Sequence, residues 1–496
     1  MVDRKVRKPE VLALVLAVGL ATGFVHDWNS VTAQVAGPTM LDPSLGVRPV
    51  VAGLTTPTTI AFIGENDILV LEKNTGRVQR VVNGAVDSTV LDLNVNFGSE
   101  RGLLGVALHP DFPSNGGVYL YWTESTTGAD TNVLANTPLL GNRVDRYTWD
   151  GTTLTFDRNL IQLRALQPAF AAEPTPVNGR GNHDGGVLAF GPDRKLYIFI
   201  GDVGRRGWLQ NLPDGPFGPG QPDDQFGGPE PDDAHLTGAI LRLNDDGTTP
   251  SDNPFFAAGA AIPGDVGENI QKIFSYGHRN SFGMAIDFSP RGLGNVWLQE
   301  NGDDSFSELN RVIPGMNGGW VQIMGPVARI EQYKAIETTP PFVGLQQQRW
   351  PPSNIADTPA DALARLFMLP GATYSDPQFS WKFEVAPGGM NFVRGSALGP
   401  QFEGDLFMGA ATPVLVGGYL FHFNLTGNRR GIGVDDPRLA DGVADNVRKH
   451  EITESETLLI GRDFGVTTDI ETGPNGNLYV VSLTRGAIYE VFRQQQ

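Results

Sequence analysis

Two short runs in the sequence carry side chains that could share a proton. His183 opens the run His183–Gly186, and the apolar stretch Leu196–Ile200 ends in Gly201 and Asp202. An imidazole titrates near neutral pH, and a carboxylate beside it fixes its tautomer and stabilises the imidazolium. The two residues predict a general base with its orienting partner, which favours an enzyme. A histidine held by contacts within a turn is the equally weighted alternative.

A cation and an amide stand side by side in a second run. Arg279 and Asn280 follow an apolar stretch within Tyr276–Gly283. Both side chains could point at negative charge that develops on an oxygen of a substrate or cofactor. A salt bridge at the edge of a sheet is the alternative interpretation.

A third run, Glu300–Asn310, surrounds Gly302 with oxygen donors. Calcium takes backbone carbonyls and carboxylates in flexible loops of this kind, although the spacing is not that of an EF-hand. The run therefore predicts either a metal site or a solvated acidic loop. A solvated loop is also the interpretation of a further acidic stretch, which contains Asp223, Asp224, Asp232 and Asp233. No phosphate-binding loop, nucleophile elbow or His-Glu-x-x-His helix occurs.

One pattern recurs along the chain and must position these residues. A turn rich in Gly, Asn and Asp precedes alternating apolar residues, which is typical of a hairpin with one buried face. The copies begin at Gly64, His109, Gly191, Pro290, Glu403 and Gly473. Such hairpins must stack to cover their apolar faces, and their uneven spacing favours radial blades with long inserted loops.

The predicted fold is therefore all-β, a six-bladed β-propeller with long inserted loops on one face. Residues 205–235 and 326–380 are too long and too rich in proline for simple turns, and we expect them on the same rim as His183. A set of β-sandwich domains is the alternative, but no charged or serine-rich linker divides the chain. Residues 48–496 are predicted to form a single domain.

The composition argues against some classes of partner and site. The 496 residues carry a formal charge of −18, which disfavours nucleic acid because phosphate backbones are bound by clustered Lys and Arg. Cysteine is absent, so the sequence offers no disulfide and no thiolate site.

The N-terminal segment, residues 1–35, predicts an export signal. Basic residues precede the apolar run Val11–Val25, and small residues follow at 31–33. An uncleaved anchor is the alternative, although the run is shorter than the ~20 residues that span a bilayer. The folded domain is expected in the periplasm or outside the cell, with no membrane contact unless this segment is retained.

Longer motifs occur in order along the chain and are strongest between 98 and 325. They are Glu100–Phe112, Asn142–Tyr147, Asn182–Gly186, Gly238–Leu243, Asp252–Phe255, Gly277–Asn280, Glu300–Gly302 and Gly315–Trp320. Together they resemble the soluble pyrroloquinoline-quinone-dependent glucose/sorbosone (aldose sugar) dehydrogenases. The resemblance implies a six-bladed propeller with the quinone and a calcium ion on its upper face. It also implies that a histidine takes the hydroxyl proton of the sugar while hydride passes to the quinone.

Carried over residue by residue, the resemblance makes His183 the base and Asp202 its partner, with Arg279 and Asn280 near the reducible carbonyl. The backbone carbonyls of Gly302 and Asp303 would bind the cofactor calcium. Asp303 stands where relatives commonly carry proline.

The resemblance also implies a second, structural ion, bound by Glu308 and the carbonyl of Gly318. Ser307 replaces an acidic residue beside Glu308. Relatives hold the cofactor carboxylates with Lys and Arg near the C-terminus, where this chain reads Met408–Pro413 instead. We predict that Arg462 takes this role, with Arg485 as the other candidate.

The leading hypothesis is thus an exported quinoprotein dehydrogenase that oxidises an aldose sugar or related polyol and passes electrons to an external acceptor. A cofactor-free propeller that binds carbohydrate or protein is the first alternative. A calcium-dependent lactonase, with His183 as the base for water, is the second.

Overall fold

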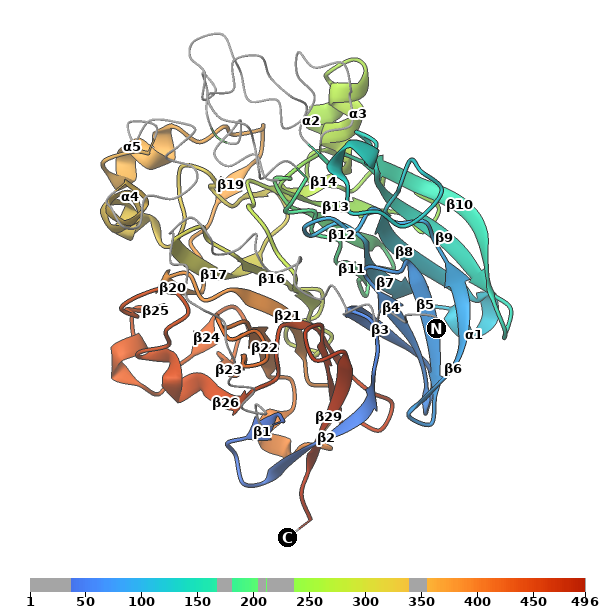
Figure 1. Cartoon of the computed structure of the whole chain (residues 1–496). Coiled ribbons are helices and arrows are strands. Elements are labelled where there is room, and N and C mark those ends of the chain that lie inside the picture. The colour runs from blue at the N-terminus through green and yellow to red at the C-terminus, as the bar shows by residue number, and fades with distance from the viewer. Residues whose placement is uncertain (1–36, 167–180, 204–210, 212–235, 339–354, 496) are drawn as a thin grey trace, which may run out of the picture.

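The computed structural model describes residues 37–166, 181–203, 211, 236–338 and 355–495. The predicted export signal and almost all of the insertion 205–235 lie outside these ranges. In the described part of the chain, the strands form six antiparallel four-stranded sheets, some of them extended by further short strands (Figure 1). None of the helices in these ranges is long and apolar enough to cross a membrane.

The sheets follow one another along the chain. The first has β3 (Pro57–Gly64), β4 (Asp67–Glu72), β5 (Arg77–Val82) and β6 (Ala85–Asp92), and the second has β7 (Leu103–Leu108), β8 (Gly117–Thr123), β9 (Asn142–Trp149) and β10 (Leu154–Leu163). The third has β11 (Leu188–Phe190), β12 (Leu196–Ile200), β13 (Ala239–Leu243) and β14 (Ile273–Tyr276), extended by β18 (Met316–Asn317) and β19 (Thr373–Tyr374). The fourth has β15 (Met284–Ile286), β16 (Val296–Glu300), β17 (Ser305–Val312) and β20 (Phe379–Phe383), extended by β25 (Val443–Ala444).

The fifth sheet has β21 (Pro387–Phe392), β22 (Leu406–Ala410), β23 (Tyr419–Leu425) and β26 (Leu459–Arg462), extended by β1 (Thr39–Met40) and β24 (Ile432–Gly433). The sixth has β27 (Thr467–Thr472), β28 (Leu478–Ser482), β29 (Ala487–Arg493) and β2 (Leu45–Ala52). The helices are short: α1 (Phe112–Asn115), α2 (Phe256–Ala260), α3 (Asp265–Lys272), α4 (Ile330–Thr338) and α5 (Pro359–Ala364).

The first strands of consecutive sheets contact one another in the closed order β3, β7, β11, β15, β21, β27 and back to β3. This ring confirms the predicted β-propeller, with one sheet in each blade. Each of the six predicted turns joins the first and second strands of one blade. The hairpin pattern in the sequence therefore identified the repeating unit of the fold.

The ring is closed by strands from both ends of the chain. β2 pairs antiparallel with β29, and the two lie side by side in Figure 1. β1 joins the neighbouring fifth blade by pairing with β26. The predicted domain start near residue 48 thus lies inside β2, and the sheet framework begins at Thr39.

The core lies between neighbouring blades, where apolar side chains from adjacent sheets pack together. Trp381 and Phe421, for example, come from the fourth and fifth blades and share one buried cluster. Near the axis the strands approach closely: a Cβ on Gly105 would lie 1.9 Å from the carbonyl oxygen of Gly186. Glycine is therefore required where the loop that carries His183 passes the second blade.

Two kinds of segment lie at one end of the ring: the residues that lead into the first strand of each blade, and the connection between the second and third strands of each blade. Backbone hydrogen bonds tie neighbouring blades together there, for example from Asp202 to the Arg279 carbonyl at 2.8 Å and from Leu103 to the Lys73 carbonyl at 3.2 Å. We call this end the upper face. The described part of the insertion 326–380 reaches it, because Glu337 on α4 accepts from the backbone of Asp304.

Candidate active site

His183 and Asp202 meet on the upper face. His183 precedes β11 and Asp202 follows β12, so the antiparallel pairing of these strands brings their ends together. His183 Nδ1 lies 2.6 Å from Asp202 Oδ1, and the two residues are 4% and 0% exposed. A proton on Nδ1 that is donated to the carboxylate leaves Nε2 as the acceptor of the ring.

The Asp202 carboxylate is held from its other side by an indole. Trp320 Nε1 donates to Asp202 Oδ2 over 2.9 Å. Trp320 lies in the segment after β18 and is 1% exposed. Because both carboxylate oxygens accept hydrogen bonds, the orientation of His183 is fixed by two segments that are far apart in the sequence.

Arg279 and Asn280 lie beside this pair, in the loop that leads into β15. Arg279 Nη1 donates to the Asn301 carbonyl at 2.7 Å, Nη2 lies 3.3 Å from Asp303 Oδ1, and the guanidinium lies over the Trp320 ring at 5.5 Å. Arg279 Nε and Asn280 Oδ1 are buried and have no hydrogen-bond partner among the described residues. These atoms offer one donor and one acceptor to a bound molecule.

Glu100 links the loop of His183 to the loop of Asn280. Its Oε2 accepts from the His183 backbone nitrogen at 2.7 Å and from Asn280 Nδ2 at 3.0 Å. The sequence analysis placed Glu100 in a motif but gave it no role. The signal that could have identified it was its position directly before a first strand, which is also where His183 and Arg279 stand.

The predicted metal turn follows β16. Asp303 and Asp304 are mostly buried there, and Lys449 Nζ donates to the Asp303 carbonyl and to Asp304 Oδ1, the latter at 3.0 Å. The same ammonium lies 4.0 Å from Glu384 Oε2. Lys449 thus brings a cation to the upper face from a segment in which the sequence analysis found no functional residue.

Glu337 extends from α4 into the same turn. Its Oε1 accepts three hydrogen bonds of 3.0 Å, from Asp304 N, Ser305 N and Ser305 Oγ. Oxygen atoms of Asp303, Asp304 and Glu337 all lie within 4.8 Å of one another. Burial, followed by the charges of Asp303 and Asp304, raises the pKa of Glu337 to about 8. The turn is therefore a concentration of carboxylate oxygens in a site of restricted solvent.

Glu308 and Gly318, which the resemblance implies for a second ion, both make hydrogen bonds within the protein, although none of these involves the Gly318 carbonyl. Glu308 accepts from Asn310 Nδ2 at 2.9 Å and from the backbone of Gly325, and Gly318 donates its backbone N–H to Tyr276. Burial, followed by the charge of Glu300, raises the pKa of Glu308 to about 8. A cation beside Glu308 would favour its ionised form.

The two arginines considered for cofactor carboxylates differ in position. Arg462 lies in β26, an outer strand of the fifth blade, where its side chain is exposed. It has no described contact with the His183 cluster, which consists of His183, Asp202, Arg279 and Asn280. Arg485 lies between β28 and β29, on the upper face, and donates to the Val416 carbonyl. Of these two, Arg485 therefore shares the face of His183.

A buried charged layer supports the loop of His183. Asp184 Oδ1 accepts from Asn142 Nδ2 at 2.9 Å, whereas Oδ2 is buried without a partner in the described residues. Burial raises the pKa of Asp184 to about 7, and burial, followed by the charge of Arg101, lowers the pKa of Lys73 to about 7. Burial therefore disfavours the ionised forms of both groups, and such shifted pKa values are common beside functional loops.

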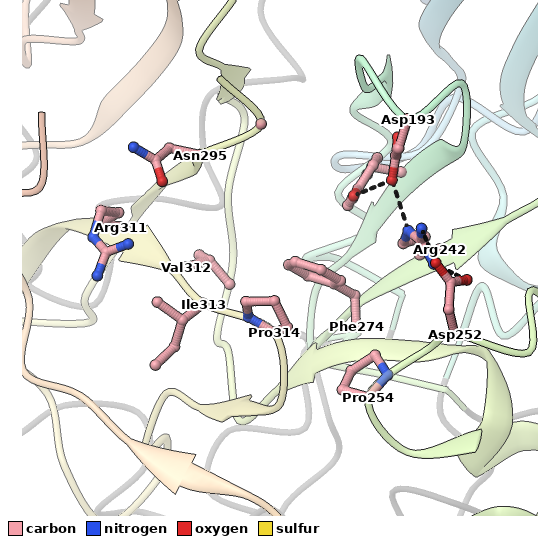
Figure 2. A pocket seen from close by; sticks show the side chains of 12 residues that line it. Asp193, Arg242, Asp252, Pro254, Phe274, Asn295, Arg311, Val312, Ile313 and Pro314 are labelled. Atoms are coloured by element: carbon pink, nitrogen blue, oxygen red, sulfur yellow. Dashed lines mark hydrogen bonds and ion pairs between the residues drawn. The ribbon is translucent and has the colours of Figure 1, made fainter. Parts of the chain in front are cut away.

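A groove of about 290 Å³ opens between the third and fourth blades, at the end of the ring opposite the upper face. Figure 2 shows Arg242 joined to Asp193 and Asp252 on one side and Arg311 on the other. Arg242 is neutralised by the two aspartates, at 2.9 Å from each. The groove contains no residue of the His183 cluster, so it does not extend that site.

Comparison with known proteins places this geometry in context. A family model described as Glucose / Sorbosone dehydrogenase matches residues 54–358. Quinoprotein glucose dehydrogenase B of Acinetobacter calcoaceticus is 29% identical over 284 residues, which are 56% of this chain and 52% of the relative. Aldose sugar dehydrogenase YliI of Escherichia coli is 24% identical over 431 residues, 86% of each chain.

Solved structures share the fold. The soluble aldose sugar dehydrogenase of Escherichia coli, in its apo form, aligns with a TM-score of 0.58 and 21% identity, over 91% of this chain and all of that one. The pyrroloquinoline-quinone-bound aldose sugar dehydrogenase of Streptomyces coelicolor aligns with a TM-score of 0.54 and 22% identity, over 91% and 99% of the two chains.

Proposed function

The chain belongs to the glucose/sorbosone dehydrogenase family, and from this premise we propose that it is a quinoprotein dehydrogenase oxidising an aldose sugar or a related polyol. The observation that carries the proposal is the 2.6 Å contact of His183 with Asp202, beside Arg279 and Asn280 on one face of the propeller. A base and a cation at one site are what alcohol oxidation by hydride removal requires.

His183 acts as the base in this proposal. Nε2 accepts the proton of the substrate hydroxyl, while Nδ1–H stays bonded to Asp202 and the imidazolium is stabilised by that carboxylate. Trp320 keeps Asp202 in place during this change of charge. Burial of the pair raises the strength of their interaction, because solvent screens it little.

The residues fit a quinone cofactor at its carbonyl end. Arg279 and Asn280 would hold it there, since each has a buried polar atom without a partner in the described residues. Pyrroloquinoline quinone, when bound, supplies the acceptor for the hydride, and calcium would polarise its carbonyl. Arg279 would stabilise the negative charge that hydride transfer places on the quinone oxygen. Lys449 and Arg485 are the upper-face cations that would meet its carboxylates.

Reconstitution tests this function. The purified mature protein, freed of cofactor, is given pyrroloquinoline quinone and calcium and assayed by dye reduction with a panel of aldoses and polyols. We expect quinone absorbance to appear on the protein and dye reduction to follow with at least one sugar. The function is wrong if neither signal appears at millimolar calcium.

A carbohydrate-binding module without a redox cofactor is the second candidate. It is favoured by the carboxylates of the upper face, because Glu100, Asp303 and Asp304 would repel a tricarboxylate, while Arg279 and Lys449 are already paired with aspartates. Sugar binding in calorimetry without quinone uptake would select it. Turnover of sugar lactones without quinone would instead select a calcium-dependent lactonase.

We also propose that the protein is exported, with residues 1–35 as its signal, and that an acceptor outside the cytoplasm takes the electrons. The basic residues before the apolar run Val11–Val25 support this location. Mass spectrometry of the mature N-terminus from a periplasmic fraction tests it.

A further inference from the structure

The turn after β16 has side-chain oxygens around it whose number and spacing suit one bound ion. Asp303, Asp304 and Glu337 each place a carboxylate oxygen within 4.8 Å of the others. Calcium binds oxygen at about 2.3–2.6 Å, so two ligands on opposite sides of it stand roughly 4.6–5.2 Å apart. The three oxygens can therefore share one calcium ion with little movement.

One of these carboxylates has an oxygen that the protein leaves without a partner. Glu337 is fully buried, and its Oε2 has no hydrogen bond among the described residues, although Oε1 accepts three. The three donors fix the side chain from α4 toward the turn. A buried, fixed and unbonded carboxylate oxygen beside two further carboxylates indicates a place for a cation.

The charges around the turn leave room for such a cation. Among the described residues, Lys449 pairs with Asp304, Arg279 pairs with Asp303, and the His450 ring lies 3.7 Å from the neighbouring Glu384. None of these groups is paired with Glu337 in the described part of the chain. The turn keeps limited access to solvent, since the side chains of Asp303 and Asp304 are 13% and 18% exposed. An ion can thus reach the site from the upper face.

We propose that Asp303, Asp304 and Glu337 form a calcium site that is loaded without any cofactor. Binding differs from that implied by the family resemblance, in which backbone carbonyls of Gly302 and Asp303 hold an ion together with the quinone. Here carboxylate side chains supply the ligands, and Lys449 competes with the ion for Asp304. The site is independent of the dehydrogenase function proposed above.

Calcium titration of the cofactor-free full chain, after treatment with a chelator, tests the site by calorimetry. We expect one calcium ion to bind, and magnesium to bind more weakly because it requires shorter and more regular coordination. Glu337→Gln keeps a carbonyl oxygen for the three donors but removes the charge, and it should weaken calcium binding at least tenfold. Lys449→Met should strengthen it by about tenfold, because the competing ammonium is gone.

Asp357→Asn is the matched control. Asp357 is an exposed carboxylate paired with Lys334 on α4 and is not one of the three clustered carboxylates, so its variant should bind calcium as the parent does. Asp304→Asn provides a second ligand variant if Glu337→Gln does not fold, as judged by circular dichroism. Unchanged calcium affinity in a folded ligand variant, or calcium binding only when quinone is present, would overturn the site. Either result would leave the proposed dehydrogenase function standing, because that function is tested separately by dye reduction with the reconstituted protein in excess calcium.

Discussion

The indole nitrogen of Trp320 donates to Asp202 Oδ2 over 2.9 Å, while the same ring packs against the guanidinium of Arg279. One side chain thus supports both the partner of the base and the cation beside it. The hydrogen bond to Asp202 fixes the pair with His183, and the ring face fixes Arg279. The proton acceptor and the group that stabilises negative charge are therefore positioned together.

Trp320→Phe should lower kcat by roughly 10- to 100-fold, because a hydrogen bond to a charged group contributes about 1.5–3 kcal/mol. KM for the sugar should change little, since phenylalanine, although smaller, keeps an aromatic ring beside Arg279. Steady-state dye reduction by the reconstituted enzyme measures both constants. Trp297→Phe is the control: Trp297 is fully buried but its Nε1 has no partner in the described residues, so kcat should be retained.

His183→Gln should lower kcat by about 10²- to 10⁴-fold, as expected when a general base is lost. Asp202→Asn should also lower kcat, because the amide neither stabilises imidazolium nor selects the Nδ1–H tautomer. The double variant should be scarcely slower than His183→Gln, since the two residues act as one unit. Additive losses in single-turnover reduction of the quinone would contradict this coupling.

Glu100 should contribute to activity by holding His183 and Asn280 in place. Glu100→Gln keeps an oxygen that can accept from the His183 backbone and from Asn280, so it should retain activity within about tenfold. Glu100→Ala leaves both donors without a partner and should lower kcat by roughly 10- to 100-fold. Equal losses in the two variants, measured by dye reduction, would show instead that the negative charge is what matters.

Asp184 should make stability depend on pH. Its pKa in the folded protein is about 7 because of burial, above its ordinary value of 3.8, so the unfolded chain releases the proton first. The free energy of unfolding should therefore fall as pH rises from about 4 to about 7, by on the order of 4 kcal/mol from this group. Asp184→Asn should remove most of that slope. Urea unfolding at pH 4.5, 6 and 7.5 measures it, with no further change from this group expected above pH 8.

The fold could be predicted because its signal is local. Each blade begins with a hairpin whose turn residues and alternating apolar positions stand within a few residues, as in Gly191–Ile198. The pairing of β2 with β29 has no such signal, because residues such as Arg48 and Glu490 are 442 positions apart. The domain start was accordingly placed inside β2.

The site was predicted in part for the same reason. His183, Asp202, Arg279 and Asn280 stand at the ends of apolar stretches, so a blade topology brings them to one face. Lys449 and Glu337 lie in an irregular segment and a short helix, and only tertiary packing brings them to Asp304, 145 positions from Lys449. Arg462 follows an apolar stretch too, but that strand lies on the outside of its blade.

Because β2 and β29 complete one blade, the folded ring has no free beginning. β2 has no strand partner until β29 has been synthesised, so the sixth blade is completed only after residue 493 has been made. Loss of β2 or β29 would leave the sixth blade without its outer strand pair. New termini cut into the turn between β11 and β12, with the old ends joined, would leave every strand pair of the circle intact.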